Sequence, residues 1–455
     1  MSIKSKLNRS LGLENLLEIP VADNDAFDDV GTVVDAVMPD GTPTPEADTV
    51  ELEIVYNAAY TSEQDLEELI EASQGIESVC LAMYIDQRDG GLTQQSARYA
   101  ALALESVGAP YDITARDMGM VSLESFDGDR STATSVSMEG LLDTLKGWWE
   151  AIVRKFKELL AKLNKYWQQS WSAAARLKSR AEALKAKSRN VSGTMSERNL
   201  EDASLYSALN IRGKVVPAAQ LITAYNQLSV PVKSPMQTDK VEAVISKFFD
   251  DLKWDNLNAG AETWRASIMS MITIPAGKLD STFKVNDVTP DFNYLKGIGG
   301  LPGNKAVVFG LNIPTTLTTT DKVLKQFTFK VADDDKDFKT PSTKPKLPTL
   351  TASEVETLCD AVITAMDTAI RNKSDGAKSV KLAKKVEDEG NSFMRDAPTD
   401  VDATKSAQAS ALMSDMVSIA KEVQSGNTQV LRYAMRTTNS MLSYAAKSLS
   451  KFKKS

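Results

Sequence analysis

Two short segments carry residue types that could bind a nucleotide or a metal ion. The segment 297–305 has the glycine content of a phosphate-binding loop, but such a loop needs adjacent glycine and lysine, followed by serine or threonine for magnesium. Here Asn304 separates Gly303 from Lys305. The segment 333–337 places carboxylates at alternate positions, as calcium loops do, but lacks the glycine and glutamate that these loops require. We therefore expect a turn between strands at the first and a solvated acidic loop at the second.

Composition removes most of the common catalytic chemistries. The 455 residues include no histidine and two cysteines, Cys80 and Cys359. Without histidine there is no Ser-His or Cys-His nucleophile pair, no imidazole general base and no imidazole ligand for a metal or haem. Both cysteines lie in apolar helical contexts, and we expect them to be small buried hydrophobic residues. The sequence predicts a protein that is not an enzyme, with no catalytic residue, cofactor or metal site.

Charge is segregated along the chain. The net charge is −8, but residues 1–130 carry −19 and residues 131–455 carry +11. Basic residues dominate 141–190, and no acidic residue follows Glu422. Solvated helix faces would explain any single cluster. The asymmetry between the two parts suggests an internal charge mask, or two partners of opposite sign.

The strongest pattern is an amphipathic helix that begins near Leu141 and continues to about Arg189. Apolar residues recur there at three- and four-residue steps. The apolar face holds four of the six tryptophans: Trp148, Trp149, Trp167 and Trp171. The opposite face carries Lys146, Arg154, Lys155, Lys157, Lys162 and Lys165. Three interpretations stay open: a core helix with solvated lysines, an interfacial membrane helix, or a helix whose lysine face contacts nucleic acid.

The elements that must position these side chains are mainly α-helical. We expect an acidic, partly disordered N-terminal segment at 1–124, a linker at 125–137, a helical region with the long amphipathic helix at 138–274, a small β-containing insertion at 275–348, and an antiparallel helical bundle with a basic C-terminus at 349–455. No apolar run reaches the length of a membrane-spanning helix, and no secretory leader is expected.

Local signals place the ends of several elements. The capping-box spacings Thr61–Gln64 and Thr351–Glu354 predict helix starts, and a further helix should begin near Thr93. Residues 1–60 should be extended or disordered apart from a short strand at 50–56. Other helices are expected at 199–209, 216–228, 239–252, 259–272, 377–396, 402–424 and 427–452, and other strands at 282–285, 305–309 and 325–331.

Several stretches, in their order along the chain, resemble the internal head (prohead core) proteins of large contractile-tailed bacteriophages. The resemblance spans most of residues 90–455. It lies in Gly91-Leu92-Thr93-Gln94-Gln95-Ser96-Ala97, 104–108, 120–126, 136–141, Leu301-Pro302-Gly303-Asn304-Lys305-Ala306-Val307 and Leu358-Cys359-Asp360.

This resemblance implies a location inside the capsid and trimming by a prohead protease. Such proteases cut after glutamate in small-x-Glu contexts, which Glu124 and Glu139 both fit. Residues 1–124 carry a net charge of −18, so a cut after Glu124 would leave a body of net charge +10. The acidic segment would then be a propeptide that masks the basic body during assembly.

We therefore expect a virion structural protein packaged inside a phage head, present in the host cytoplasm during assembly. Its expected partners are capsid and scaffold proteins, the prohead protease and packaged double-stranded DNA, bound without sequence preference. The DNA contacts would come from the lysine face of the long helix and from a second set: Arg432, Arg436, Lys447, Lys451, Lys453 and Lys454. The alternative is a protein ejected with the genome, which binds the host envelope through the tryptophan face of 141–171.

Overall fold

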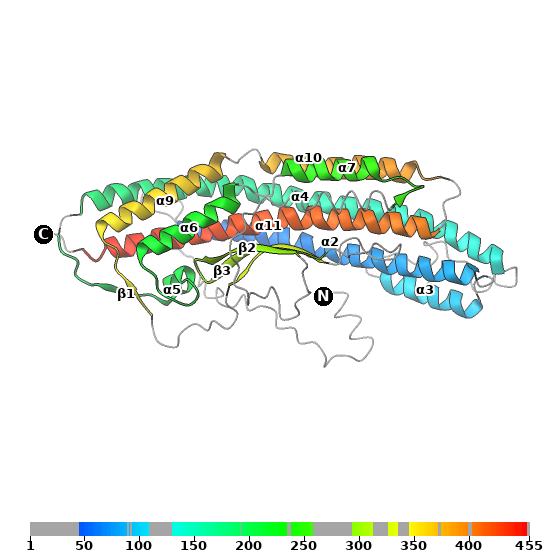
Figure 1. Cartoon of the computed structure of the whole chain (residues 1–455), viewed down its shortest axis with the longest axis horizontal. Helices are drawn as coiled ribbons and strands as arrows, with labels where there is room; N and C mark the ends of the chain where they lie inside the picture. Colours follow the sequence, from blue (N-terminus) through cyan, green and yellow to red (C-terminus); the bar gives the residue numbers. More distant parts are fainter. Residues whose placement is uncertain are drawn as a thin grey trace.

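The fold is that of a computed structural model of the whole chain. The residues that it describes are 45–88, 91, 93–108, 130–191, 193–233, 238–257, 294–312, 326–334, 345–371, 375–398 and 403–452. Helices form an elongated body, and a small sheet lies on one side of it (Figure 1). The expected fold class, mainly α with a small β insertion, is confirmed.

The central element is α4 (Arg130–Arg189), which at 1.5 Å per residue is about 90 Å long. No proline interrupts it, and its buried positions recur every three or four residues from Trp148 to Leu184. The predicted amphipathic helix is therefore confirmed. It begins earlier than expected, because residues 130–137 of the expected linker are its first two turns.

Within residues 45–60, the acidic helix α2 (Pro45–Arg88) replaces the extended chain and the strand that were expected there, whereas residues 1–44 lie outside the described residues. Proline at the first helical position is favourable, because its missing N–H would have no partner there. Buried residues then recur at helical spacing, as in Val55, Ala59 and Leu66. Thr61, expected to cap a helix, lies inside this one, where its hydroxyl donates to the Asn57 carbonyl at 3.0 Å.

Two other helix starts are confirmed by their capping hydrogen bonds. At α3 (Gln94–Gly108), the Ser96 amide donates to Thr93 Oγ1 at 3.0 Å and the Thr93 amide donates to Ser96 Oγ at 2.9 Å. At α9 (Ala352–Arg371), the Thr351 amide donates to Glu354 Oε2 at 2.8 Å and the Glu354 amide to Thr351 Oγ1 at 3.2 Å. Both pairs satisfy amides that the first helical turn leaves without carbonyl partners.

The last helix, α11 (Ala403–Leu449), is one element where two were expected. Gly426 does not end it. The glycine is required because a strand crosses the helix at this point, and an added Cβ would overlap the ring of Phe329. Many polar side chains of α11 are buried, and hydroxyls such as those of Thr428 and Thr438 donate to carbonyls one turn earlier, at 2.9 and 2.8 Å.

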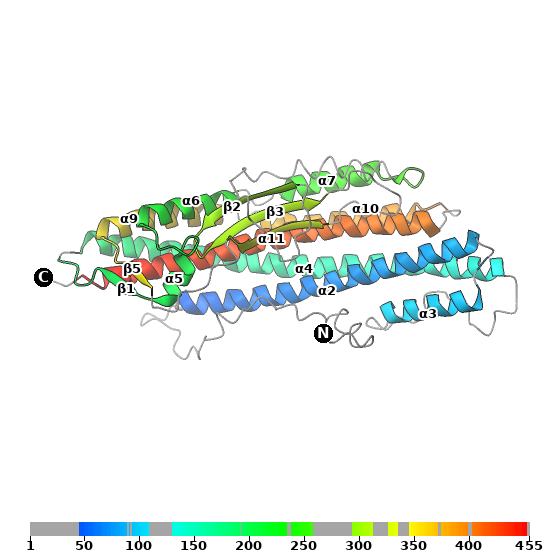
Figure 2. The same ribbon diagram turned by 60° about the horizontal axis from the view of Figure 1, so that its bottom comes forward.

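The helices that pack around α4 run either parallel or antiparallel to it. The contacts of Tyr56 with Tyr166 and of Asp65 with Lys155 place α2 antiparallel to α4. The hydrogen bonds from Trp167 to Thr428 and from Arg180 to Asn439 place α11 parallel to α4. Helices α9 and α10 (Asp375–Arg395) lie end to end along α4, as Figures 1 and 2 show. The C-terminal helices therefore do not form a separate bundle, because α4 supplies much of their contact surface.

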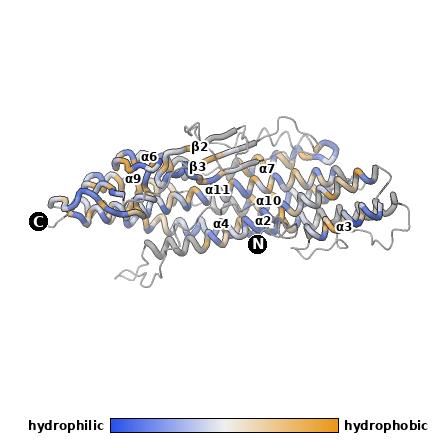
Figure 3. The backbone as a smooth tube through the Cα atoms, turned by 90° about the horizontal axis from the view of Figure 1, so that it is seen from below, coloured by the Kyte–Doolittle hydropathy of each residue, from blue (hydrophilic) through white to orange (hydrophobic). Residues whose placement is uncertain are grey.

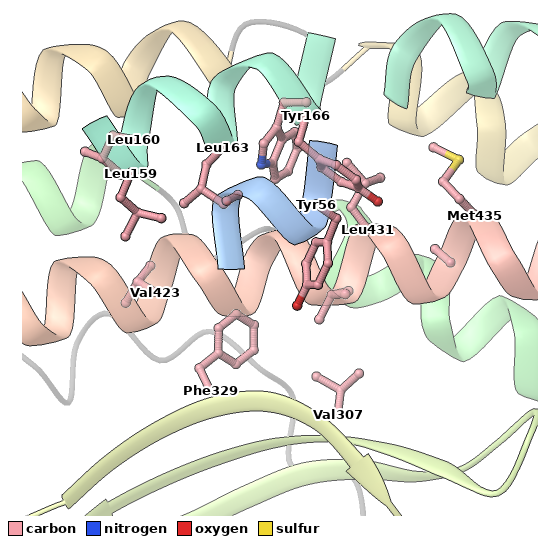
Figure 4. Close-up of a cluster of buried hydrophobic side chains, with 14 of the residues drawn as sticks. Tyr56, Leu159, Leu160, Leu163, Tyr166, Val307, Phe329, Val423, Leu431 and Met435 are labelled. Atoms are coloured by element: carbon pink, nitrogen blue, oxygen red, sulfur yellow. The ribbon is translucent and has the colours of Figure 1, made fainter. Parts of the chain in front are cut away.

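One continuous hydrophobic core joins the two ends of the chain. It takes in side chains of α2, α4, α9, α10 and α11, and Figure 4 shows Tyr56, Leu163 and Leu431 meeting within it. In Figure 3 the apolar positions of the long helices alternate with hydrophilic ones, as expected of amphipathic elements. The expected boundary at residue 124 thus separates two helices, α2 and α4, that share a core.

The β insertion is a three-stranded antiparallel sheet in the order β2–β3–β4: β2 (Tyr294–Leu301), β3 (Lys305–Asn312) and β4 (Gln326–Asp333). Phe329 and Val307 point from it toward α11 (Figure 4). The expected turn is confirmed at 302–304, where Gly303 and Asn304 have φ values of 72° and 57°. Residues 297–301, however, belong to a strand. The strand expected at 282–285 and the helix expected at 259–272 lie outside the described residues.

Smaller elements cover the outer side of this body. A two-stranded sheet pairs β1 (Asn199–Glu201) with β5 (Lys346–Pro348), and β1 precedes the short helix α5 (Ala203–Leu209). Helix α6 (Ala218–Lys233) packs on α9, and helix α7 (Thr238–Asp251) packs on α10. Among the described helices, none has an apolar stretch long enough to cross a bilayer.

Candidate nucleic-acid interface

The tryptophan face of α4 points into the chain's own core. Trp148, Trp149, Trp167 and Trp171 are 2%, 3%, 8% and 8% exposed. Trp149 Nε1 donates to Asn391 Oδ1 of α10 at 3.1 Å, and Trp167 Nε1 donates to Thr428 Oγ1 of α11 at 3.1 Å. The prediction of a membrane or partner face here is corrected, because in this fold the indole rings fill the space between helices.

Much of the predicted lysine face of α4 is used to hold other helices. Toward α2, Lys155 Nζ lies 3.6 Å from a carboxylate oxygen of Asp65, and Lys162 donates to the hydroxyl of Ser62. Toward α10, Lys157 pairs with Glu387. A continuous free basic face is therefore absent from this part of the described helix.

The predicted C-terminal cations are also engaged within the chain. The Arg432 guanidinium lies 4.0 Å above the centre of the Tyr56 ring, and Arg436 is half-buried. Lys451 Nζ lies 2.7 Å from Glu197 Oε2, and Lys447 pairs with Asp202.

The hydrogen bonds at Asp202 show that this last pairing stabilises the carboxylate. Partial burial raises the pKa of Asp202, but hydrogen bonds from the Leu205 amide and from Lys447 outweigh burial and hold the pKa below its ordinary value. The contact therefore fastens the end of α11 to the start of α5.

Five predicted site residues lie wholly or partly outside the described structure. Glu124, Lys453 and Lys454 lie outside the described residues. Glu139 and Lys146 lie within α4, but the structure does not describe their side chains. The helical backbone at Glu139 is not the extended conformation that a protease active site usually accepts.

A group of exposed cations lies where α9 ends and α10 begins, alongside α4. We call it the basic strip: Lys165, Arg371, Lys381 and Lys384. All four side chains are exposed, and none has an ion pair within the described part of the chain. Arg154 is similarly exposed, nearer the N-terminal end of α4.

Two ion pairs fix where along α4 the cations of the strip lie. Lys178 Nζ of α4 lies 2.7 Å from Asp367 Oδ1 of α9, and Lys157 of α4 pairs with Glu387 of α10. In this antiparallel register the four cations lie beside positions 160–174 of α4, a span of about 20 Å at 1.5 Å per residue. Because Asp367 and Glu387 are already paired, they leave the strip net positive.

Sequence reasoning found Lys165 but missed the other three members. A signal was available, because Lys378, Lys381 and Lys384 repeat at helical spacing. What the sequence could not indicate is that α9 and α10 lie end to end along α4, beside Lys165.

A second charged cluster lies inside the α2–α11 contact. Lys421 is 4% exposed and lies 3.1 Å from Glu422, 3.8 Å from Glu67 and 3.9 Å from Glu63. Burial lowers the pKa of Lys421, but the three carboxylates outweigh it and raise the pKa above its ordinary value. Burial raises the pKa of Glu63 to about 7. The cluster joins two helices.

Two other groups that the sequence singled out, Cys359 and Asp334, have buried side chains. Cys359 is buried, as expected, and burial raises the pKa of its thiol to about 11. Asp334 was expected in a solvated loop, but its side chain is fully buried and accepts from Arg212 Nε and the Gly300 amide, both at 2.7 Å. Among the described residues, no group of three or more cysteine, aspartate or glutamate side chains could hold a metal ion.

Comparison with known families identifies the family of this chain. A model of the phiKZ-like phage internal head proteins matches residues 44–447. The chain belongs to this family. The match begins one residue before α2 and ends in the last turn of α11, so the internal head protein family includes the acidic helix as well as the basic body. No curated protein and no solved structure matches the chain.

Membership confirms the resemblance that the sequence motifs indicated. An internal head protein is a structural component of the phage head, located inside it.

Proposed function

We propose that this internal head protein contacts packaged double-stranded DNA, without sequence preference, through the basic strip. One observation carries the proposal. The four cations of the basic strip are exposed and lack ion pairs within the described residues: Lys165, Arg371, Lys381 and Lys384. By contrast, ion pairs inside the chain engage Lys155, Lys157, Lys447 and Lys451.

The geometry of the strip suits phosphates. Its length of about 20 Å covers more than half of the roughly 34 Å turn of B-DNA. Lysine and arginine contacts to phosphates need no base readout. Each neutralised phosphate releases counterions, so log K should fall with log salt by about 0.9 per contact.

The test compares two triple variants in the full chain. The strip variant is Lys165→Gln, Lys381→Gln, Lys384→Gln. The control is Lys187→Gln, Lys214→Gln, Lys253→Gln, which removes the same charge from exposed lysines elsewhere. Fluorescence anisotropy with a duplex of roughly 30 base pairs, between about 50 and 200 mM salt, gives the affinity and its salt slope.

We expect the strip variant to lose affinity and to reduce the salt slope by about 2 to 3, because up to three phosphate contacts disappear. The control should change both far less. Equal losses in the two variants would mean that only net charge matters, and an affinity insensitive to salt would refute phosphate contact altogether.

Trimming after Glu124 belongs to the same proposal. The cut would divide the chain into an acidic segment of net charge −18 and a basic body of net charge +10, and later release of the acidic segment would favour contact with a polyanion. Of the two predicted sites, Glu139 is disfavoured because it lies in α4. N-terminal sequencing of the protein from mature particles is the test. A new terminus at Ser125 is expected, and a single species that still begins at residue 1 or 2 would end the trimming proposal.

Contact with capsid and scaffold proteins, and a cytoplasmic stage during assembly, stay predictions from the sequence.

A further inference from the structure

Helix α3 lies at the edge of the body, beside the C-terminal end of α2 (Figures 1 and 2). Ala97 and Leu104 are buried, and Ala100 packs against the core. These positions recur at three- and four-residue steps and form one side of the helix, which faces α2. The opposite side of α3 has no such cover from the described helices.

That opposite side carries a seam of four exposed residues: Gln95, Tyr99, Leu102 and Ser106. Tyr99 is 63% exposed and Leu102 is 54% exposed, and they are two of the five exposed large apolar side chains among the described residues. Gln95 Nε2 donates to the Tyr99 hydroxyl at 3.4 Å, so the two side chains lie along the same side. Spacings of four, three and four residues are those of a coiled-coil seam.

The charged residues beside the seam indicate which kind of partner could bind to it. Arg98 and Glu105 are seven residues apart, so they flank the seam on the same side, one near each end of the helix. Both are exposed and have no ion pair within the described residues. On the other flank are the small residues Ser96 and Ala103, which permit close approach of a second helix.

This face is complementary to itself. When two identical helices pack antiparallel, the same flank of each helix meets. Arg98 of one copy then lies opposite Glu105 of the partner subunit, and the pair occurs twice about the two-fold axis. The Leu102 side chains meet near that axis. In a parallel pair, the charged flank would instead meet Ser96 and Ala103.

We propose that α3 is a self-association surface, through which two copies of this chain pair as antiparallel helices. Tyr99 and Leu102 form the apolar seam, and Arg98 pairs with Glu105 across it. This goes beyond the proposed DNA contact and does not depend on it, because the basic strip lies on other helices. A helix of 15 residues offers a small interface, so the association should be weak and concentration-dependent.

The test is sedimentation velocity of the full chain over a concentration series from about 1 µM to about 1 mM. Arg98→Glu alone and Glu105→Arg alone each place like charges opposite one another, and each should weaken association at least about tenfold. The double variant Arg98→Glu, Glu105→Arg restores both pairs and should recover it. An equimolar mixture of the two single variants should also associate, because each supplies the charge that the other needs.

Controls separate this outcome from misfolding and from the DNA proposal. All these side chains are exposed, so circular dichroism and the melting temperature should not change. Lys214→Glu, another exposed reversal, should leave association intact, and so should the strip variant. A monomer throughout the concentration range would overturn the proposal. So would binding of Tyr99 and Leu102 to anionic vesicles without self-association, or a failure of the swapped charges to restore it.

Discussion

At the scale of single residues, the charged groups between α2 and α11 show how burial controls ionisation. The folded chain keeps a proton on Glu63 until about pH 7, whereas the unfolded chain loses it near 4.5. Between these values unfolding releases a proton, so this group makes the folded state less stable as pH rises. The penalty is absent below about pH 4.5 and complete above about pH 7.

We expect Glu63→Gln to remove this penalty. The variant should gain stability relative to the native chain at about pH 8, by at most about 3 kcal/mol, and much less at about pH 5. Urea unfolding at the two pH values measures the difference. Glu67→Gln, which also removes a carboxylate beside Lys421 but from a largely exposed side chain, is the control. The same change for Glu63→Gln at both pH values would contradict the argument.

At the scale of elements, glycines within helices have two different roles. Gly426 of α11 lies under Phe329 of β4, and Gly390 of α10 lies against the Trp149 ring. Gly147 of α4 is exposed, and an added Cβ would meet nothing within 4 Å. The first two allow close packing, whereas the third only lowers helix propensity.

Alanine substitutions should separate these roles. Gly426→Ala should destabilise the fold by about 1 to 3 kcal/mol through overpacking, despite better helix propensity. Gly147→Ala should stabilise it by about 0.5 to 1 kcal/mol. Denaturant midpoints of the two variants provide the comparison, and a stabilising Gly426→Ala would show that β4 does not press on α11.

Short sequence motifs predicted where several helices begin, but not which helices pack against them. The Thr351–Glu354 spacing correctly gave the start of α9, because a capping box depends on a few adjacent residues. The same signal failed at Thr61, since it says nothing about whether the preceding chain is already helical. The lysine face of α4 was visible in sequence, but Asp65 and Glu387 come from distant helices, and only the tertiary fold pairs them with Lys155 and Lys157.

At the scale of the whole molecule, the acidic and basic parts of the chain are not separate bodies. Helix α2 lies against both α4 and α11, and its Tyr56 and Leu66 are part of the common core. Helix α2 contacts cations of both α4 and α11, at Lys155, Lys421 and Arg432.

A cut after Glu124 in the folded protein should consequently leave the two fragments associated. We expect residues 1–124 and 125–455 to co-elute in gel filtration under native conditions and to separate in denaturant. Expression of 125–455 alone should give a less stable product, because the apolar surface under α2 would be exposed. Separation of the fragments in native buffer would mean that α2 contributes little to holding the body together.

The placement of α11 has a consequence for biosynthesis. This helix leaves the ribosome after every other helix described, yet it lies in the middle of the body and meets residues as distant as Tyr56. Until it emerges, the apolar sides of α2 and α4 have no complete partner, and nascent chains on neighbouring ribosomes would tend to aggregate. Folding should therefore be largely post-translational and slowed by long-range contacts, and chaperones that shield apolar surface should raise the yield of soluble protein.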